Sequence, residues 1–174
     1  MLTDRLGVAS REVRTPEDLA AVDALVIPGG ESTTLDRLLG TSGLREPLAD
    51  RLGAGMPAFG TCAGLILLGR QTEDGRPDQR PFGAIDIISR RNGYGRQVAS
   101  FEGTVELADE GEPMRGVFIR APRIVSTGDG VEVVGSHDGE PVAVRQGPVL
   151  VVAFHPELTD DDRLHRRFLS LLDG

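Results

Sequence analysis

Gly60-Thr61-Cys62-Ala63-Gly64 is the most informative segment of this sequence, because it predicts a sharp turn between a strand and a helix. Before it stand the apolar residues 57–59, which suit a buried strand, and after it comes Leu65-Ile66-Leu67-Leu68, which suits a buried helix. A strand that turns into a helix within so few residues strains the central residue and crowds its neighbours, so the flanking glycines indicate a nucleophile elbow. The Cys62 thiol would then lie at a helix N-terminus, where the helix dipole favours the reactive thiolate. In the same turn, the amide of Ala63 could donate a hydrogen bond to an oxyanion.

Cys62 is the single cysteine of the chain. A lone cysteine is most often a small buried hydrophobic residue, and the elbow is what favours a nucleophile here. One cysteine allows no intrachain disulfide and makes a cysteine-based zinc site improbable, so we expect neither a metal ion nor a cofactor. All nineteen basic residues are arginines. Without lysine the chain cannot form a Schiff base with a carbonyl substrate and cannot build a P-loop.

The composition is that of an ordinary globular protein. The 174 residues, 39% of them hydrophobic, fit a single domain spanning residues 1–174. A net charge of -8 gives no electrostatic reason to bind nucleic acid or an anionic membrane. No apolar run approaches the ~20 residues of a membrane span. The N-terminal residues have no apolar segment typical of a secretory signal, so the expected location is cytoplasmic.

Short apolar runs alternate with helical periodicity along the chain, which predicts an α/β fold with helices on both faces of a sheet. Thr15-Pro16-Glu17-Asp18 is typical of a helix start, and Ser32 or Thr33 could cap the next helix. We expect Thr159 to cap a last helix with Leu164, Phe168, Leu171 and Leu172 facing inward. Residues 71–81 are expected to form a surface loop. The predicted strands are 24–27, 85–88, 117–119, 131–134, 142–144 and 150–154.

The apolar run 150–154 ends in His155-Pro156-Glu157. Proline disfavours the helical conformation for the residue before it, so His155 is expected to be extended. In an extended chain, residues two apart point the same way, so Glu157 could accept from one imidazole nitrogen and leave the other to take a thiol proton. A structural histidine at a strand end is the alternative. The other histidines, His137 and His165, are interpreted as a solvated turn residue and an exposed helix residue.

Five sequence runs together resemble a known family. These runs are PGGESTT at 28–34, GTCAGL at 60–65, RNGYGRQVASFE at 91–102, GVFIRAP at 116–122 and FHPEL at 154–158. They resemble the glutaminase subunit of the pyridoxal 5′-phosphate synthase complex, from about residue 13 to the C-terminus. The first and last runs, with the cysteine turn, are shared more loosely with other triad glutaminases, whereas the runs around Arg91 and Arg120 are more specific.

The resemblance implies a three-layer, flavodoxin-like class I glutamine amidotransferase fold. It implies a catalytic triad of Cys62, His155 and Glu157, and oxyanion donors at the amides of Gly30 and Ala63. The residues implied to bind L-glutamine are Gly30, Glu31, Ser32, Arg91, Ile119 and Arg120. A cation such as arginine suits the substrate α-carboxylate. The implied partner is a lysine-using barrel synthase, to which the ammonia would be delivered for vitamin B6 biosynthesis.

Members of that family usually begin with a further strand, a Gln-Gly turn and most of a helix before the region matched here, so we expect an N-terminally shortened fold. From the sequence we expect lower solubility and activity than a version with a family-like extension would have. Three alternatives remain open: a glutaminase of another pathway, a cysteine peptidase or related hydrolase on a similar fold, and a non-catalytic or impaired regulatory subunit.

Overall fold

The computed structural model describes residues 6–94, 100–109 and 111–172. Five helices and a 3-10 turn lie in this part of the chain: α2 (Pro16–Ala20), α3 (Ser32–Thr41), α4 (Arg45–Gly53), α5 (Ala63–Leu68), η1 (Pro156–Leu158) and α6 (Arg163–Ser170). The strands are β1 (Leu25–Ile27), β2 (Ala58–Thr61), β3 (Gln71–Thr72), β4 (Ile87–Arg90), β5 (Ser100–Leu107), β6 (Met114–Ile119), β7 (Arg123–Thr127), β8 (Glu132–His137), β9 (Glu140–Gln146) and β10 (Val149–Val152).

The main sheet has seven strands in the order β1-β2-β10-β9-β8-β5-β6. Strands β1, β2 and β10 are parallel, and the remaining pairs are antiparallel. A second sheet holds β3, β4 and β7. The predicted α/β class is therefore confirmed, although only three strands of the main sheet have the parallel arrangement that doubly wound folds use throughout.

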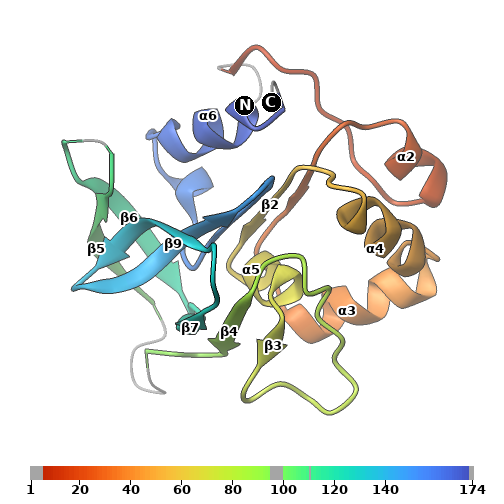
Figure 1. Cartoon of the computed structure of the whole chain (residues 1–174), viewed down its shortest axis with the longest axis horizontal. Coiled ribbons are helices and arrows are strands. Elements are labelled where there is room, and N and C mark those ends of the chain that lie inside the picture. The colour runs from red at the N-terminus through yellow and green to blue at the C-terminus, as the bar shows by residue number, and fades with distance from the viewer. Residues whose placement is uncertain (1–5, 95–99, 110, 173–174) are drawn as a thin grey trace.

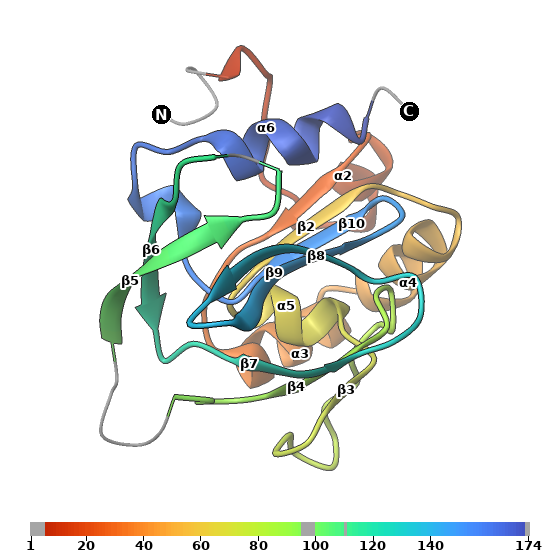
Figure 2. The same ribbon diagram turned by 60° about the vertical axis from the view of Figure 1, so that its left-hand side comes forward.

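Helices cover both faces of the parallel strands, as Figures 1 and 2 show. Helix α6 lies on one face, and α5 with α3 lies on the other. All four residues of β2 and all four of β10 are buried, which is the burial that a strand covered on both faces requires. Their carboxyl ends lie side by side, because Thr61 is paired with Val152. The residues that follow these two strands, Cys62 and His155, are thereby brought to one edge of the sheet.

Local capping signals were interpreted correctly at one helix and wrongly at two. Thr15 caps α2 and forms a capping box with Asp18, as the sequence predicts. Helix α3 begins at Ser32, so the capping position falls on the residue before it. The side chain of Glu31 therefore caps this helix, in place of Ser32 or Thr33. Helix α6 begins only at Arg163, and Thr159 ends the preceding 3-10 turn instead.

Three strands, β3, β5 and β7, were not predicted from the sequence. Strand β5 alternates exposed and more buried residues and carries polar side chains outward, so it lacks the continuous apolar run of the central strands. Strand β7 buries Ile124 and exposes Val125. The expected loop at 71–81 is interrupted only by the two-residue β3. Leu172, expected to face inward, is 40% exposed because it lies beyond the end of α6.

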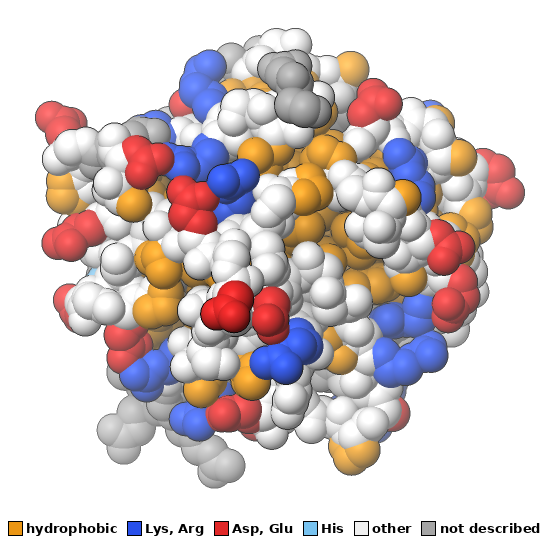
Figure 3. All heavy atoms as spheres, in the orientation of Figure 1, with side chains coloured by type: hydrophobic (Ala, Val, Ile, Leu, Met, Phe, Trp, Pro, Cys, Tyr) orange, Lys and Arg blue, Asp and Glu red, His pale blue; other side chains and the backbone are white. Residues whose placement is uncertain are grey.

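No helix in the described ranges is long and apolar enough to cross a membrane. On the face shown in Figure 3, acidic and basic side chains are interspersed.

Candidate active site

Cys62 occupies the predicted elbow between β2 and α5. Its backbone has φ 51° and ψ -100°, a strained conformation for a residue with a side chain. A Cβ added to Gly60 would lie 2.6 Å from the carbonyl carbon of Gly64. A Cβ added to Gly64 would come closer than 3.0 Å to the carbonyl oxygen of Ile27 on β1. Both glycines are therefore required by steric contacts across the turn, which confirms the predicted geometry.

The thiol of Cys62 lies in a nearly enclosed position. The residue is only 7% exposed, and its Sγ–H donates to the Ile119 carbonyl oxygen at 3.8 Å. The backbone N–H of Cys62 donates to the Val152 carbonyl at 2.9 Å, so the end of β10 holds the elbow in place. Because Ile119 ends β6, the structure brings together one substrate residue implied by the resemblance and the predicted nucleophile.

His155 and Glu157 are in direct contact. The Nδ1–H of His155 donates to Oε1 of Glu157 over 2.7 Å. His155 is not helical, with φ -112° and ψ 82°, and its N–H donates to the Val117 carbonyl at 2.8 Å. The expectation of an extended chain fails at the next residues, because Pro156–Leu158 forms a 3-10 turn. The 3-10 turn still directs the Glu157 side chain back to the imidazole. The hydrogen bond between His155 and Glu157 therefore forms across a turn and not along an extended strand, as we had predicted.

The electrostatics of this pair favour a charged imidazole. A hydrogen bond to Cys62, followed by the one to Glu157, outweighs burial and raises the pKa of His155 to about 9. Burial alone would raise the pKa of Glu157, but the hydrogen bond from His155 and nearby positive charge hold that pKa below its ordinary value. A cationic imidazole next to a thiol stabilises the thiolate, which is the nucleophilic form.

Gly29 is a contributor that the sequence analysis did not assign. A Cβ at this position would lie less than 3.0 Å from Cε1 of His155 and 3.1 Å from its Nδ1. The backbone of the loop after β1 thus lies so close to the imidazole ring that no side chain fits between them. The signal in the sequence was the glycine pair, of which only Gly30 was assigned a role.

The glycine loop also carries an ion pair. Nη2 of Arg91 lies 3.0 Å from Oε1 of Glu31, across 60 positions of sequence. Glu31 accepts from the backbone N–H groups of Thr33 and Thr34 at 3.1 and 2.7 Å. Burial acts to raise the pKa of Glu31, but the hydrogen bonds from Thr34 and Thr33 lower it to about 2. Glu31 is therefore an ionised carboxylate that hydrogen bonds hold in place, and it lies half exposed beside the Arg91 guanidinium.

The remaining predicted site residues take different positions. Ser32 is buried at 3% exposure in the first turn of α3. Arg120 is exposed and has φ 44°, so the chain turns sharply directly after β6. Ala63 is the first residue of α5, where its amide belongs to the unpaired helix start. Residues 95–99 of the motif around Arg91 lie outside the described residues.

Both interpretations of the other histidines were wrong. His137 ends β8, its Nδ1 lies 2.8 Å from the Thr104 carbonyl, and its ring packs on Phe101 and Phe118. His165 is 8% exposed and packs edge-on against Phe59. Within the described ranges, no group of three or more His, Cys, Asp and Glu side chains could hold a metal ion.

An elbow cysteine and a histidine–glutamate pair, at the carboxyl edge of three parallel strands, fit the class of glutamine amidotransferases. A crystal structure described as a glutamine amidotransferase superposes with a TM-score of 0.92 and 45% identity, over 99% of this chain and 91% of that one. A Thermoplasma acidophilum protein, described as part of a GMP synthase, shares the fold with a TM-score of 0.68 and 16% identity, over 99% of this chain and 85% of that chain. The expected glutamine amidotransferase fold is confirmed.

The chain belongs to the SNO glutamine amidotransferase family, whose model matches residues 2–172. Relatives named pyridoxal 5′-phosphate synthase subunit PdxT include those of Acidothermus cellulolyticus, 54% identical over 95% of this chain and 83% of the relative, and Mycobacteroides abscessus, 52% identical over 95% and 86%. The Streptomyces coelicolor relative is 52% identical over 94% of this chain and 81% of its own length. The resemblance stated from the sequence is thereby confirmed, and the chain is a glutaminase by family.

Proposed function

We propose that this chain hydrolyses L-glutamine to L-glutamate and ammonia through a triad of Cys62, His155 and Glu157. The observation that carries the proposal is the geometry of the three side chains. His155 is joined to Glu157 by a hydrogen bond of 2.7 Å, and Cys62 raises the pKa of His155, which supports the order nucleophile, base and orienter. The strained elbow and the charged imidazole both serve a thiolate nucleophile, and neither has an evident structural use.

In the proposed reaction, the thiolate of Cys62 attacks the side-chain amide carbon of glutamine. The amides of Gly30 and Ala63 hold the oxyanion that forms, and electrostatic stabilisation of this kind is usually a large part of the rate enhancement. His155 gives its proton to the departing ammonia. A water molecule, deprotonated by His155, then hydrolyses the γ-glutamyl thioester and releases glutamate.

The amino-acid end of the substrate would be held by Glu31 and Arg91, with Ser32, Ile119 and Arg120 completing the pocket. A paired carboxylate and guanidinium match the two charges of a zwitterion, the carboxylate facing the ammonium and the guanidinium facing the carboxylate. The separation of 3.0 Å between Glu31 and Arg91 supports this assignment, because a single amino acid could contact both charged groups at once.

The partner in this proposal is the barrel subunit of a pyridoxal 5′-phosphate synthase, which would receive the ammonia. The support is the name shared by the relatives, each called a subunit of that synthase. Ammonia that escapes into water at neutral pH is protonated and loses its nucleophilicity. Direct transfer between docked subunits avoids that loss, so activity is expected to depend on docking.

The test measures glutamate release with and without the synthase for the parent, Cys62→Ala and a control, Gly53→Ala. Gly53 ends α4, and a Cβ there meets nothing within 4 Å. Cys62→Ala should fall below ~1% of the parent rate, since loss of a triad nucleophile removes several orders of magnitude. Glu157→Gln should be slow, but less so than His155→Ala.

Three results would point elsewhere. A Cys62→Ala variant with parental glutamate release would end the covalent mechanism. A parent that binds the synthase yet releases no glutamate would instead identify a regulatory subunit. Glutamate release that never depends on the synthase would indicate a glutaminase of another pathway.

A further inference from the structure

Arg91 follows directly after β4, and the neighbour of β4 is the short strand β3 within the segment expected to be a surface loop. The two strands are parallel, with Gln71 beside Ile88 and Thr72 beside Ser89. The hydroxyl groups of Thr72 and Ser89 lie 3.1 Å apart and share a hydrogen bond. Figures 1 and 2 show β3 and β4 side by side. The residues after β3 therefore lie along the end of β4.

Two acidic residues after β3 hold the end of β4. The N–H of Glu73 donates to the Ser89 carbonyl at 2.9 Å, and the Glu73 carboxylate accepts from Nε and Nη2 of Arg90 at 3.0 and 2.6 Å. The next residue, Asp74, accepts from the backbone N–H of Arg91 at 2.6 Å through Oδ1. A hydrogen bond to a carboxylate is stronger than one between neutral groups. Asp74 therefore fixes the main chain at the point where the Arg91 side chain begins.

A second contact holds the chain just beyond Arg91. The N–H of Gly93 donates to the Ala121 carbonyl at 3.0 Å. A Cβ on Gly93 would lie 2.7 Å from the backbone nitrogen of the first residue of β7, so the close approach needs glycine. Ala121 comes directly after Arg120, the other arginine of the proposed substrate site. The main chain of Arg91 is thus held at two points, its own N–H and a residue two positions later.

The loop that carries Asp74 is itself attached at its far end. Arg45, at the start of α4, is only 7% exposed, and its Nη1 donates to the Arg80 carbonyl at 2.8 Å. The same guanidinium lies 4.9 Å from the centre of the Phe82 ring. The N–H of Phe82 donates to the Leu67 carbonyl of α5 at 2.7 Å. The loop is therefore anchored to the helices at one end and to β4 at the other.

We propose that Asp74 is a positioning residue for glutamine binding, which holds the Arg91 main chain so that the guanidinium stays beside Glu31. The two contacts in series are 2.6 Å from the Arg91 nitrogen to Asp74 and 3.0 Å from Arg91 Nη2 to Glu31. The inference rests on the proposed glutamine site and extends it by one residue that acts through Arg91. Ordering a long side chain and its main chain on binding costs entropy. Asp74 reduces that cost in the free protein, so it acts on the affinity for glutamine and not on the chemical step.

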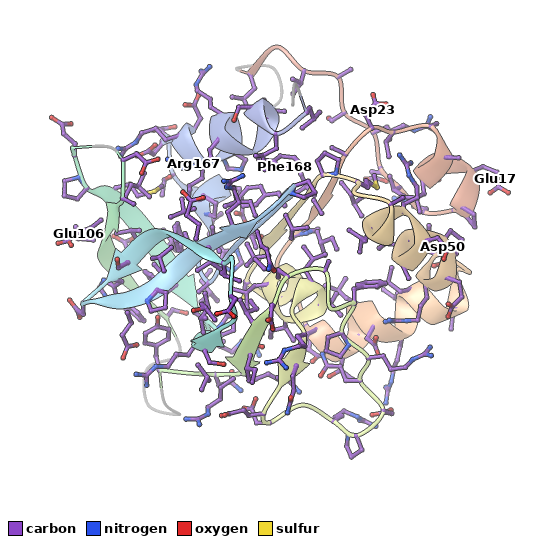
Figure 4. All side chains as sticks on the ribbon, in the orientation of Figure 1. Glu17, Asp23, Asp50, Glu106, Arg167 and Phe168 are labelled. Carbon is purple, nitrogen blue, oxygen red and sulfur yellow. The ribbon has the colours of Figure 1, made fainter. Side chains whose placement is uncertain are left out.

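The test measures glutamate release in the presence of the synthase for Asp74→Ala, Asp74→Asn and two controls. Asp78→Ala removes an acid of the same loop, which accepts from Nε of Arg76 at 2.9 Å. Glu106→Ala removes an exposed acid of β5, far from β3 and β4 (Figures 1 and 4). Asp74→Ala should raise KM for glutamine about threefold to tenfold and leave kcat within about twofold. Asp74→Asn keeps an acceptor oxygen and should regain most of the affinity, and both controls should retain the parental KM.

A double-mutant cycle separates positioning from a general structural effect. If Asp74 acts through Arg91, Asp74→Ala should change KM by less than about 1.5-fold once Arg91→Ala is present. The Asp74 side chain is exposed, so its loss removes no buried packing, and the melting temperature should stay within about 3 °C of the parent's.

A parental KM in Asp74→Ala would overturn the proposal, and so would an equal rise in KM when Arg91→Ala is already present. Asp74→Asn with as high a KM as Asp74→Ala would also overturn it, because the hydrogen bond would then not be what positions Arg91. Failure of the proposed function itself is recognised separately, by a Cys62→Ala variant that still releases glutamate.

Discussion

Replacing Gly29 by alanine should damage catalysis far more than it damages folding. The added Cβ would lie less than 3.0 Å from Cε1 of His155 and 3.1 Å from its Nδ1. Carbon atoms rest at about 3.5–4.0 Å, so the imidazole must retreat by about 1 Å. The ring is a movable side chain at the edge of the sheet, and it can yield without displacing any strand.

The retreat of the ring has a cost that can be estimated from its contacts. The bond from His155 to Glu157 is 2.7 Å long, and a further 1 Å takes it beyond hydrogen-bonding distance. A misplacement of about 1 Å in a reacting group can cost about 10²-fold in rate. We therefore expect Gly29→Ala to lose about two orders of magnitude in kcat, while its melting temperature falls by only a few degrees.

The assay is glutamate release in the presence of the synthase, together with thermal unfolding of the same samples. Gly53→Ala, which adds a methyl group into open space at the end of α4, is the matched control and should retain parental rates. Gly29→Ala turning over glutamine at more than about half the parental rate would refute the reasoning, because the ring would then not depend on the glycine.

Three further outcomes follow from the site. Arg91→Ala should raise KM for glutamine about tenfold or more, because the substrate carboxylate loses its charged hydrogen bond from the guanidinium, while iodoacetamide should still alkylate the thiol at the parental rate. The pKa of His155 rises on folding from 6.5 to about 9, so its stabilising contribution is complete below pH 6.5 and is lost as the pH approaches 9. Denaturant titrations should therefore show parental stability falling relative to His155→Ala over that interval; parallel curves would contradict the shift. Gly64→Ala forces a methyl group against the Ile27 carbonyl, which should lower the free energy of unfolding by ~1–3 kcal/mol and the melting temperature by about 2–12 °C. An unchanged melting temperature would show that the elbow can relax.

Features that arise within a few residues of chain could be predicted from the sequence. The glycines at 60 and 64 are needed because their missing side chains would strike backbone atoms across the turn, and that need is visible as a spacing. The capping box of Thr15 and the proline after His155 act over three residues or fewer, so they too could be read directly. The continuous apolar runs of β2 and β10 predicted strands covered on both faces.

Features that depend on contacts between distant segments became visible only in the folded chain. Gly29 meets His155 because the parallel strands β1 and β10 end at one edge of the main sheet, and Glu31 meets Arg91 because the end of β4, in the second sheet, lies beside the loop after β1. The antiparallel half of the sheet and strand β5 depend on pairing partners that no local pattern names. His165 was misjudged for the same reason: its arginine neighbours along the chain suggested an exposed face. The physical reason is that burial is set by what packs against a residue, and the packing partner on β2 is about a hundred positions away in the sequence.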